Sequence, residues 1–265
     1  TAAVGPTAPM DNTQILILGL AAVTSAIIKN GTAVGAGIFL LPVLALVFPP
    51  KVALGLGAPI MLASDFVGLR NYWREWCDWR EIMRLVVAGA LGIATGAACI
   101  NVIPANLFKL GIGLFATGFA AYQLGKDGIA ALRRRRGAAM SAPPRVSGGL
   151  AAALGIGYMG GLVTVLAHAG GIVWSMYFLS RKLDKRCFVG SLILLLTLSD
   201  AIKIVAYTQI GILSPSSLLI ILAMSPIVIL GSNLGNRLNK MVPLPLFRGV
   251  VLVFILVVGA RLALS

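Results

Sequence analysis

The chain has 265 residues, of which 58% are hydrophobic and only 11% are charged, whereas soluble domains carry about 25% charged residues. Its net charge of +14 does not indicate nucleic-acid binding, because the basic residues lie in short loops beside long apolar runs and form no recognisable binding module. The composition therefore excludes a soluble globular protein and predicts an all-α polytopic membrane protein.

Ten apolar segments follow one another along the chain after a short N-terminal tail at residues 1–13. In the first half we expect a broken-helix hairpin and then three transmembrane helices, with bounds near 14–47, 52–70, 82–101 and 104–124. A basic linker at 125–147 separates the two halves. The second half repeats this order, with a hairpin at 148–179 and helices near 187–208, 213–235 and 243–264.

Each predicted hairpin contains a break, KNGTAVGAG at 29–37 in the first and HAGG at 168–171 in the second. Both arms of the first hairpin, and the second arm of the other, are shorter than the about 20 residues that cross a bilayer. We therefore expect both hairpins to be re-entrant, entering and leaving the membrane on the same side.

The two halves resemble each other in segment order and in residue spacing. A Ser-Asp pair ends at Asp65 and another at Asp200, and each is followed by a tyrosine at the same distance downstream. This pattern indicates an internal duplication. Because each repeat would hold three full spans, an odd number, we expect two inverted repeats, which is a common plan for transporters.

The basic loops predict the orientation of the chain. Lysine and arginine residues cluster near 70–84, 125–147, 181–186 and 237–240, and the positive-inside rule assigns these loops to the cytoplasm. Both termini should then lie outside, most simply in a bacterial inner membrane. We interpret Arg133–Arg136 mainly as a topology signal, with binding of anionic membrane lipid as a secondary role.

The two breaks form the predicted substrate-binding site. A helix that begins after a break presents free N–H groups and a partial positive charge, which together bind anions, and glycines allow the backbone to approach the ligand closely. Each glycine alone is equally explained by tight helix packing. The predicted substrate-binding residues are Lys29, Asn30, Gly31, Thr32, Gly35, Gly37, Thr164, His168, Gly170 and Gly171.

The ionisable residues near the breaks each have two interpretations. Lys29 is either a counter-charge for the anion or a lysine that extends to an interface. His168 either donates to the anion or carries a proton, or it is a neutral histidine bonded to broken-helix carbonyls. Asp65, Asp200 and Lys203 are candidates for gating or proton coupling, with a structural ion pair between Asp200 and Lys203 as the alternative.

The three cysteines, Cys77, Cys99 and Cys187, have no paired or metal-like spacing, so we expect neither a disulfide framework nor a zinc site. The chain has one histidine and no HExxH or GxSxG pattern. We therefore expect no catalytic residues, no metal and no cofactor, and hence no enzyme. The expected partners are a small anion and membrane lipid rather than nucleic acid.

Several short motifs resemble the TauE/SafE family of sulfite and sulfonate exporters. They are GAGIFLLPVLAL at 35–46, PPKVALG at 49–55, Asp78-Trp79-Arg80 and GALGIATGA at 89–97, with weaker counterparts at 170–171, 213–215 and 231–235. The chain departs from the family pattern at Ala36, Cys77 and Met176. The resemblance implies two repeats that export or take up a small sulfur-containing anion, such as sulfite or an organosulfonate.

Export is the direction we favour from this resemblance. Uptake, a channel-like path for another small anion and a non-transporting membrane assembly subunit are the alternatives that the sequence leaves open. Solute flux through the purified protein alone in liposomes separates a transporter from an assembly subunit.

Overall fold

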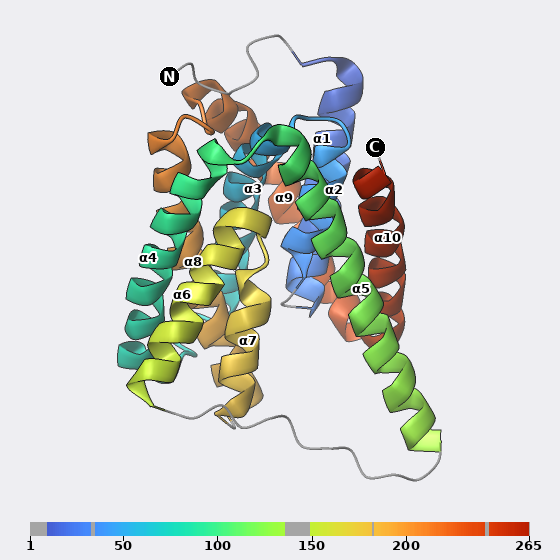
Figure 1. Ribbon diagram of the computed structural model, residues 1–265. Coiled ribbons are helices and arrows are strands. Elements are labelled where there is room, and N and C mark those ends of the chain that lie inside the picture. Colours follow the sequence, from blue (N-terminus) through green and yellow to red (C-terminus); the bar gives the residue numbers. More distant parts are fainter. Residues whose placement is uncertain (1–9, 33–34, 136–148, 182, 242–243, 265) are drawn as a thin grey trace.

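The computed structural model describes residues 10–32, 35–135, 149–181, 183–241 and 244–264. These residues form ten α-helices and no strand (Figure 1), which confirms the all-α prediction for the described chain. The helices are α1 (Asn12–Thr32), α2 (Ala36–Ala45), α3 (Pro50–Asn71), α4 (Trp79–Val102), α5 (Ala105–Arg135), α6 (Leu150–Ala167), α7 (Gly170–Ser180), α8 (Lys185–Gln209), α9 (Pro215–Met241) and α10 (Leu244–Leu264).

Six of the described helices, α1, α3, α4, α5, α6 and α8, are long and apolar enough to cross a membrane. This set differs from the expected one. α1 has 21 residues and α6 has 18, so the expectation that both arms of the first hairpin are too short to cross is wrong for α1. Its helix continues through Lys29 and Asn30, whose side chains find partners inside the protein. In α9 and α10 the described apolar stretches are shorter, at 222–235 and 249–264.

The helices pack mainly in pairs, α4 with α6, α5 with α10, α1 with α9 and α3 with α8. Glycines bring α4 and α6 into backbone contact: a Cβ at Gly92 would lie 2.1 Å from the carbonyl oxygen of Tyr158, and one at Gly161 would lie 2.0 Å from that of Gly89. Small residues at such crossings are typical of membrane helices, which associate through close packing rather than through the hydrophobic effect.

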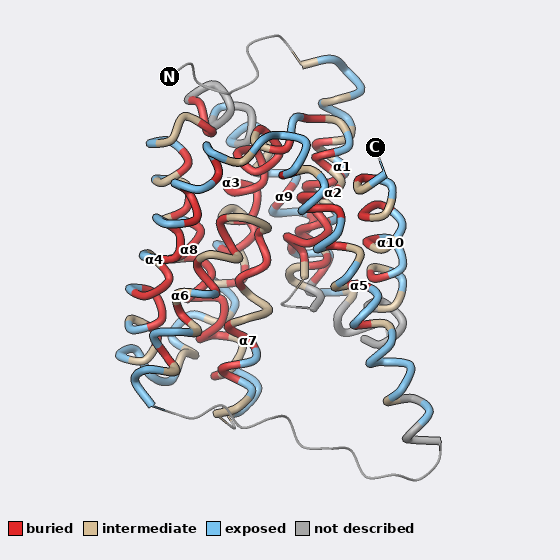
Figure 2. Tube along the Cα trace, viewed as in Figure 1, coloured by how far each residue is buried: buried red, intermediate tan, exposed pale blue. Residues whose placement is uncertain are grey.

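The outer helices expose apolar side chains, as a lipid environment requires, and the central helix buries polar ones. Figure 2 shows buried segments gathered in the middle of the molecule and exposed segments along the outer helices α4, α5 and α10. Large apolar side chains are exposed on these helices, for example Leu91, Leu114 and Val253. In contrast, the central helix α3 buries even its Ser64 and Asp65.

The ends of the helices mark two faces of the molecule. α1 begins and α10 ends at the upper end of Figure 1, whereas α5 ends and α6 begins at the lower end. α5 continues to Arg135, so the first part of the segment expected to be a linker is helical. Residues 136–147 of that linker, including Arg136, and residues 1–9 of the tail lie outside the described residues.

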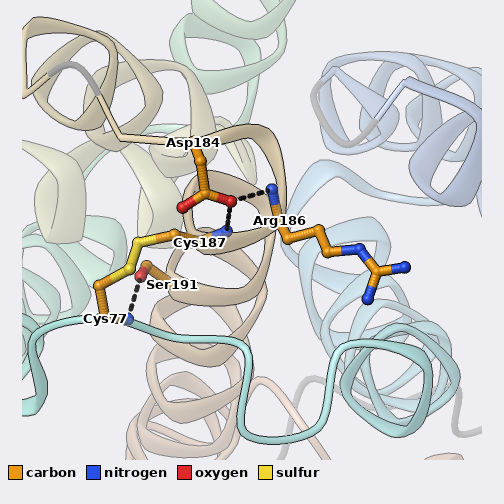
Figure 3. The surroundings of a disulfide bond; sticks show 5 residues. All are labelled: Cys77, Asp184, Arg186, Cys187 and Ser191. Atoms are coloured by element: carbon orange, nitrogen blue, oxygen red, sulfur yellow. Dashed lines mark hydrogen bonds between the residues drawn. A yellow bond between two sulfur atoms is a disulfide. The ribbon is translucent and has the colours of Figure 1, made fainter.

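The structure contradicts the expectation that the cysteines are unpaired. Cys77 and Cys187 form a disulfide with a Cα–Cα distance of 5.5 Å (Figure 3), whereas Cys99 is free and exposed. The two partners are 110 residues apart in sequence, and such a pairing leaves no spacing signal, because packing of the α3–α4 connection on α8 brings them together. The disulfide links the two halves of the chain.

Candidate functional site

The two predicted breaks lie in contact with each other. α2 begins after Gly35, whose φ is 98°, a left-handed conformation that glycine adopts readily. α6 ends at His168, which has φ 51° and ψ 27°, and α7 begins directly afterwards at Gly170. A Cβ at Gly37 would lie 2.0 Å from the carbonyl oxygen of His168. Only a glycine therefore fits where the first break meets the second.

A cavity of about 30 Å³ lies between the breaks and brings together most of the predicted site residues. It offers space for a group of only a few atoms. The predicted residues that line it are Lys29, Gly35, Gly37, Thr164, His168, Gly171, Asp200 and Lys203.

The other predicted residues lie beside the cavity rather than in its wall. The amide of Asn30 donates to Ser64 Oγ at 2.9 Å, and Gly170 packs against the carbonyl of Gly160 on α6. Asp65 is buried behind Lys29. Gly31 and Thr32 end α1, and their side-chain surroundings lie outside what the structure describes.

The helix N-termini at the cavity lack side-chain caps. α2 follows Gly35 and α7 follows Ala169, and neither N-cap residue makes a side-chain hydrogen bond. By comparison, Asp78 and Asp184 cap α4 and α8 by accepting from backbone N–H groups. The first N–H groups of α2 and α7 therefore receive no side-chain cap from Gly35 or Ala169, and each terminus carries about half a positive charge. Together they form the arrangement that binds an anion.

A chain of buried ionic contacts runs beside these termini. Lys29 Nζ lies 2.6 Å from Asp65 Oδ1 and 3.5 Å from Asp200 Oδ2. Lys203 Nζ lies 2.6 Å from Asp200 Oδ1. Lys29 also donates to the Met61 carbonyl at 3.1 Å. The four charged side chains come from α1, α3 and α8, so the cluster joins the two halves of the chain, and its formal charges sum to zero.

His168 has both ring nitrogens engaged. Lys203 Nζ lies 2.8 Å from Nδ1, and Nε2 lies 3.3 Å from the Leu54 carbonyl oxygen. Because the ammonium can only donate, Nδ1 accepts and Nε2 carries the proton that is donated to Leu54. This is the neutral, carbonyl-bonded histidine of the sequence analysis rather than a free donor. Gly57 leaves room for the ring, since a Cβ there would lie 2.7 Å from Nε2.

The structural pairing of Asp200 with Lys203 also holds, but it is part of a larger network that sequence reasoning missed. Ser64 Oγ lies 3.2 Å from Ser232 Oγ on α9, and the Tyr207 hydroxyl donates to the Val165 carbonyl at 2.6 Å. In the sequence, the tyrosine after Asp200 marks only the internal repeat. Its distance from the aspartate places it two turns further along α8 on the same face. This spacing is the sequence signal that could have indicated that the tyrosine belongs to the network.

A second, wider cavity of about 410 Å³ adjoins the central one and shares Gly35 and Ile172 with it. It runs between α5, α7 and α10, and Gln123, Lys126 and Asp127 line it near the end of α5. Figure 1 shows that α5 ends on the face opposite to the start of α1. The site therefore adjoins a cavity that extends toward the lower face in that view. No local sequence pattern indicates this cavity.

Comparison with known proteins yields one family match. Residues 17–262 match the family model described as "Sulfite exporter TauE/SafE". No curated protein and no solved structure matches the chain. The family match covers both halves of the sequence and both breaks, and it confirms the resemblance that the short motifs indicated.

Proposed function

Because the chain belongs to the TauE/SafE family of sulfite exporters, we propose that it exports a small sulfur-containing anion, such as sulfite or an organosulfonate. The chain is an integral membrane protein of a transporter family, with six helices suited to crossing a membrane. The observation that carries the proposal is the meeting of two uncapped helix N-termini at one buried cavity.

The oxygens of the anion accept hydrogen bonds from the first N–H groups of α2 and α7. The absence of a side chain at Gly37 lets the first break pack directly against the His168 backbone, which brings the two helix N-termini together at the cavity. Two helix termini with about half a positive charge each offset one negative charge. They therefore balance the whole charge of a monoanion, or one of the two charges of a dianion. A cavity of about 30 Å³ has to widen for this substrate, so the described form is a contracted state of the site.

The neighbouring ionic cluster couples the anion to a proton. Its two lysines and two aspartates are already balanced, so an arriving anion leaves an excess negative charge in a poorly solvated site, which is unfavourable. A proton on one carboxylate restores neutrality and frees a lysine. Asp65 is the natural acceptor, because it is fully buried and because its carboxylate is the ion-pair partner of Lys29.

Lys29 then serves as the group that responds to this proton. It lines the central cavity and contacts Asp65 at 2.6 Å. When Asp65 is protonated, the attraction that holds the ammonium toward Asp65 is lost, and Lys29 turns toward the anion. Asp65, Asp200 and Lys203 thus act in gating and proton coupling, and Lys29 acts in binding.

The access route supports export as the direction of transport. The cavity of about 410 Å³ leads to the face at which α5 ends, and the basic segments on that face are those that the positive-inside rule assigns to the cytoplasm. Substrate enters from this face. Two inverted repeats that rock against each other then expose the breaks to the other side. The narrow central cavity favours such a carrier over an open channel-like path.

The test is flux in proteoliposomes that contain the purified protein alone. We expect radiolabelled sulfite and organosulfonates to cross faster than in protein-free liposomes, and their flux to respond to an imposed pH gradient. The organosulfonate is the cleaner substrate, because it has no volatile neutral form that crosses lipid unaided. Absence of protein-dependent flux for every sulfur oxyanion tested contradicts the proposal, and flux that ignores the gradient contradicts the proton coupling.

A further inference from the structure

The two cysteines of the Cys77–Cys187 disulfide differ in their exposure to solvent. Cys77 lies in the connection between α3 and α4 and is exposed, whereas Cys187 is buried in the first turn of α8. The Cα–Cα distance of 5.5 Å lies within the range that a disulfide spans. A nucleophile in solution therefore reaches the Cys77 sulfur before that of Cys187.

The disulfide is the covalent part of a larger clasp between residues 72–78 and α8. Arg186 Nη1 lies 2.9 Å from Glu75 Oε1, and the Cys77 N–H donates to Ser191 Oγ at 3.4 Å. A Cβ at Gly190 would lie 3.0 Å from the Glu75 backbone, so the loop rests directly on the helix. α8 is also the helix that carries Asp200 and Lys203. The clasp thus connects the basic loops to the helix of the ionic cluster.

We propose that sulfite itself modifies this disulfide covalently. The inference rests on the proposed function, because that function supplies sulfite as the reactant. The sulfur of sulfite carries a lone pair and attacks the exposed Cys77 sulfur. A bond forms between these two sulfurs, the Cys77–Cys187 bond breaks, and its electron pair leaves with Cys187. The products are an S-sulfonate on Cys77 and a thiolate on Cys187, so the two negative charges of sulfite are divided between them and no oxidant or reductant is consumed.

The surroundings favour this direction of attack. Cys187 lies in the first turn of α8, where the helix terminus stabilises the departing thiolate, and a better leaving thiolate speeds exchange. The Arg186 side chain is 76% exposed, and with its basic neighbours it raises the local concentration of anions. The Asp184 carboxylate caps α8 and repels the negatively charged thiolate. This repulsion reduces the stabilisation that the helix terminus provides.

The modification makes the clasp respond to sulfite. Without the disulfide, the loop keeps the ion pair, the hydrogen bond and its packing at Gly190, but it loses the covalent link to α8. When sulfite is depleted, the Cys187 thiolate attacks the S-sulfonate, releases sulfite and restores the disulfide. The basic loops involved belong to the face predicted to be cytoplasmic, where persistent disulfides are rare and those that form are usually transient or act as sensors.

Peptide mass spectrometry of the purified, air-oxidised protein tests the proposal. After incubation with sulfite and alkylation of free thiols, we expect one SO₃ group on Cys77 and an alkyl group on Cys187. Sulfate and methanesulfonate, whose sulfur has no lone pair, should leave the disulfide intact. The Arg186→Gln variant should react several-fold more slowly at low salt, and high salt should reduce this difference. Cys99, which is free, should be alkylated in every sample and serves as the internal control.

Alkylation of both Cys77 and Cys187 in oxidised protein before sulfite is added overturns the inference, and so does a sulfonate that forms on Cys187 instead. A variant with Cys77→Ser and Cys187→Ser separates this inference from the proposed function. Sulfite flux through that variant, with no adduct in the wild type, refutes the modification site alone. An adduct in detergent without flux in any variant refutes the transport proposal alone. For the sensor role, prior sulfite treatment should change organosulfonate flux in the wild type and not in the variant; an equal response in both contradicts it.

Discussion

Gly37→Ala tests whether contact between the two breaks is required for transport. The new methyl group would lie 2.0 Å from the carbonyl oxygen of His168 and 2.5 Å from its Cβ, whereas non-bonded heavy atoms in contact are about 3.5–4.0 Å apart. The two backbones must then separate by more than about 1 Å. Overpacking of this kind costs about 1–3 kcal/mol. If the two breaks keep this contact when the cavity widens for the substrate, the cost corresponds to a roughly fivefold to 150-fold loss of transport.

The assay is organosulfonate flux in proteoliposomes, normalised to the amount of folded protein by size-exclusion chromatography and thermal unfolding. Gly19→Ala is the matched control, because Gly19 lies in α1 of the same hairpin and a Cβ there would meet no atom within 4 Å. This control should retain full flux and gain about 0.5–1 kcal/mol of stability. Wild-type flux in folded Gly37→Ala protein would refute the reasoning that the breaks must touch for the site to work.

Three further results are expected. Lys203→Met leaves the buried Asp200 with one distant lysine partner, which should cost about 3–5 kcal/mol and lower the unfolding temperature; adding Asp200→Asn should recover most of this loss. Asp65→Asn keeps the side-chain shape but removes the proposed proton acceptor, so substrate flux should persist and lose its response to a pH gradient. Lys126→Cys, in a chain with Cys99→Ser, should react with an impermeant thiol reagent only from the cytoplasmic side.

Each of these has a result that contradicts it. A Lys203→Met protein as stable as the wild type means that the ion pair is not needed in the fold. An unchanged gradient response in Asp65→Asn removes Asp65 from the coupling, with Asp78→Asn as the control, since an asparagine still caps α4. Labelling of Lys126→Cys from outside whole cells reverses the predicted orientation.

The parts of the fold that could be predicted are those with a local signal. Long apolar runs and the glycine-rich breaks mark the helices, and the structure places the break residues Gly35 and Gly171 at one cavity. The apolar pattern underestimates the length of α1, because the polar residues Lys29 and Asn30 look like the end of an apolar segment. Asp65 and Ser64 on α3 are their partners, and these contacts allow the polar end of α1 to be buried. Because the partners lie on another helix, no local sequence pattern shows these contacts.

The roles of the ionisable residues illustrate the same limit. Spacing alone allowed Asp200 to pair with Lys203 on one helix face, and this contact exists. The engagement of His168 by Lys203 and by the Leu54 carbonyl depends on how α3, α6 and α8 meet. The Cys77–Cys187 disulfide depends likewise on packing between distant segments. Contacts of this kind become visible only once the helices are assembled.

The most direct test of the central claim is to locate a bound oxyanion by crystallography or cryo-electron microscopy. Selenite, a heavier analogue of sulfite with a strong anomalous signal, is a suitable probe for crystals of the purified protein. We predict its density between the N-termini of α2 and α7, beside Gly37 and Gly171. Density at another place in the protein, with these two helix N-termini unoccupied, would contradict the account.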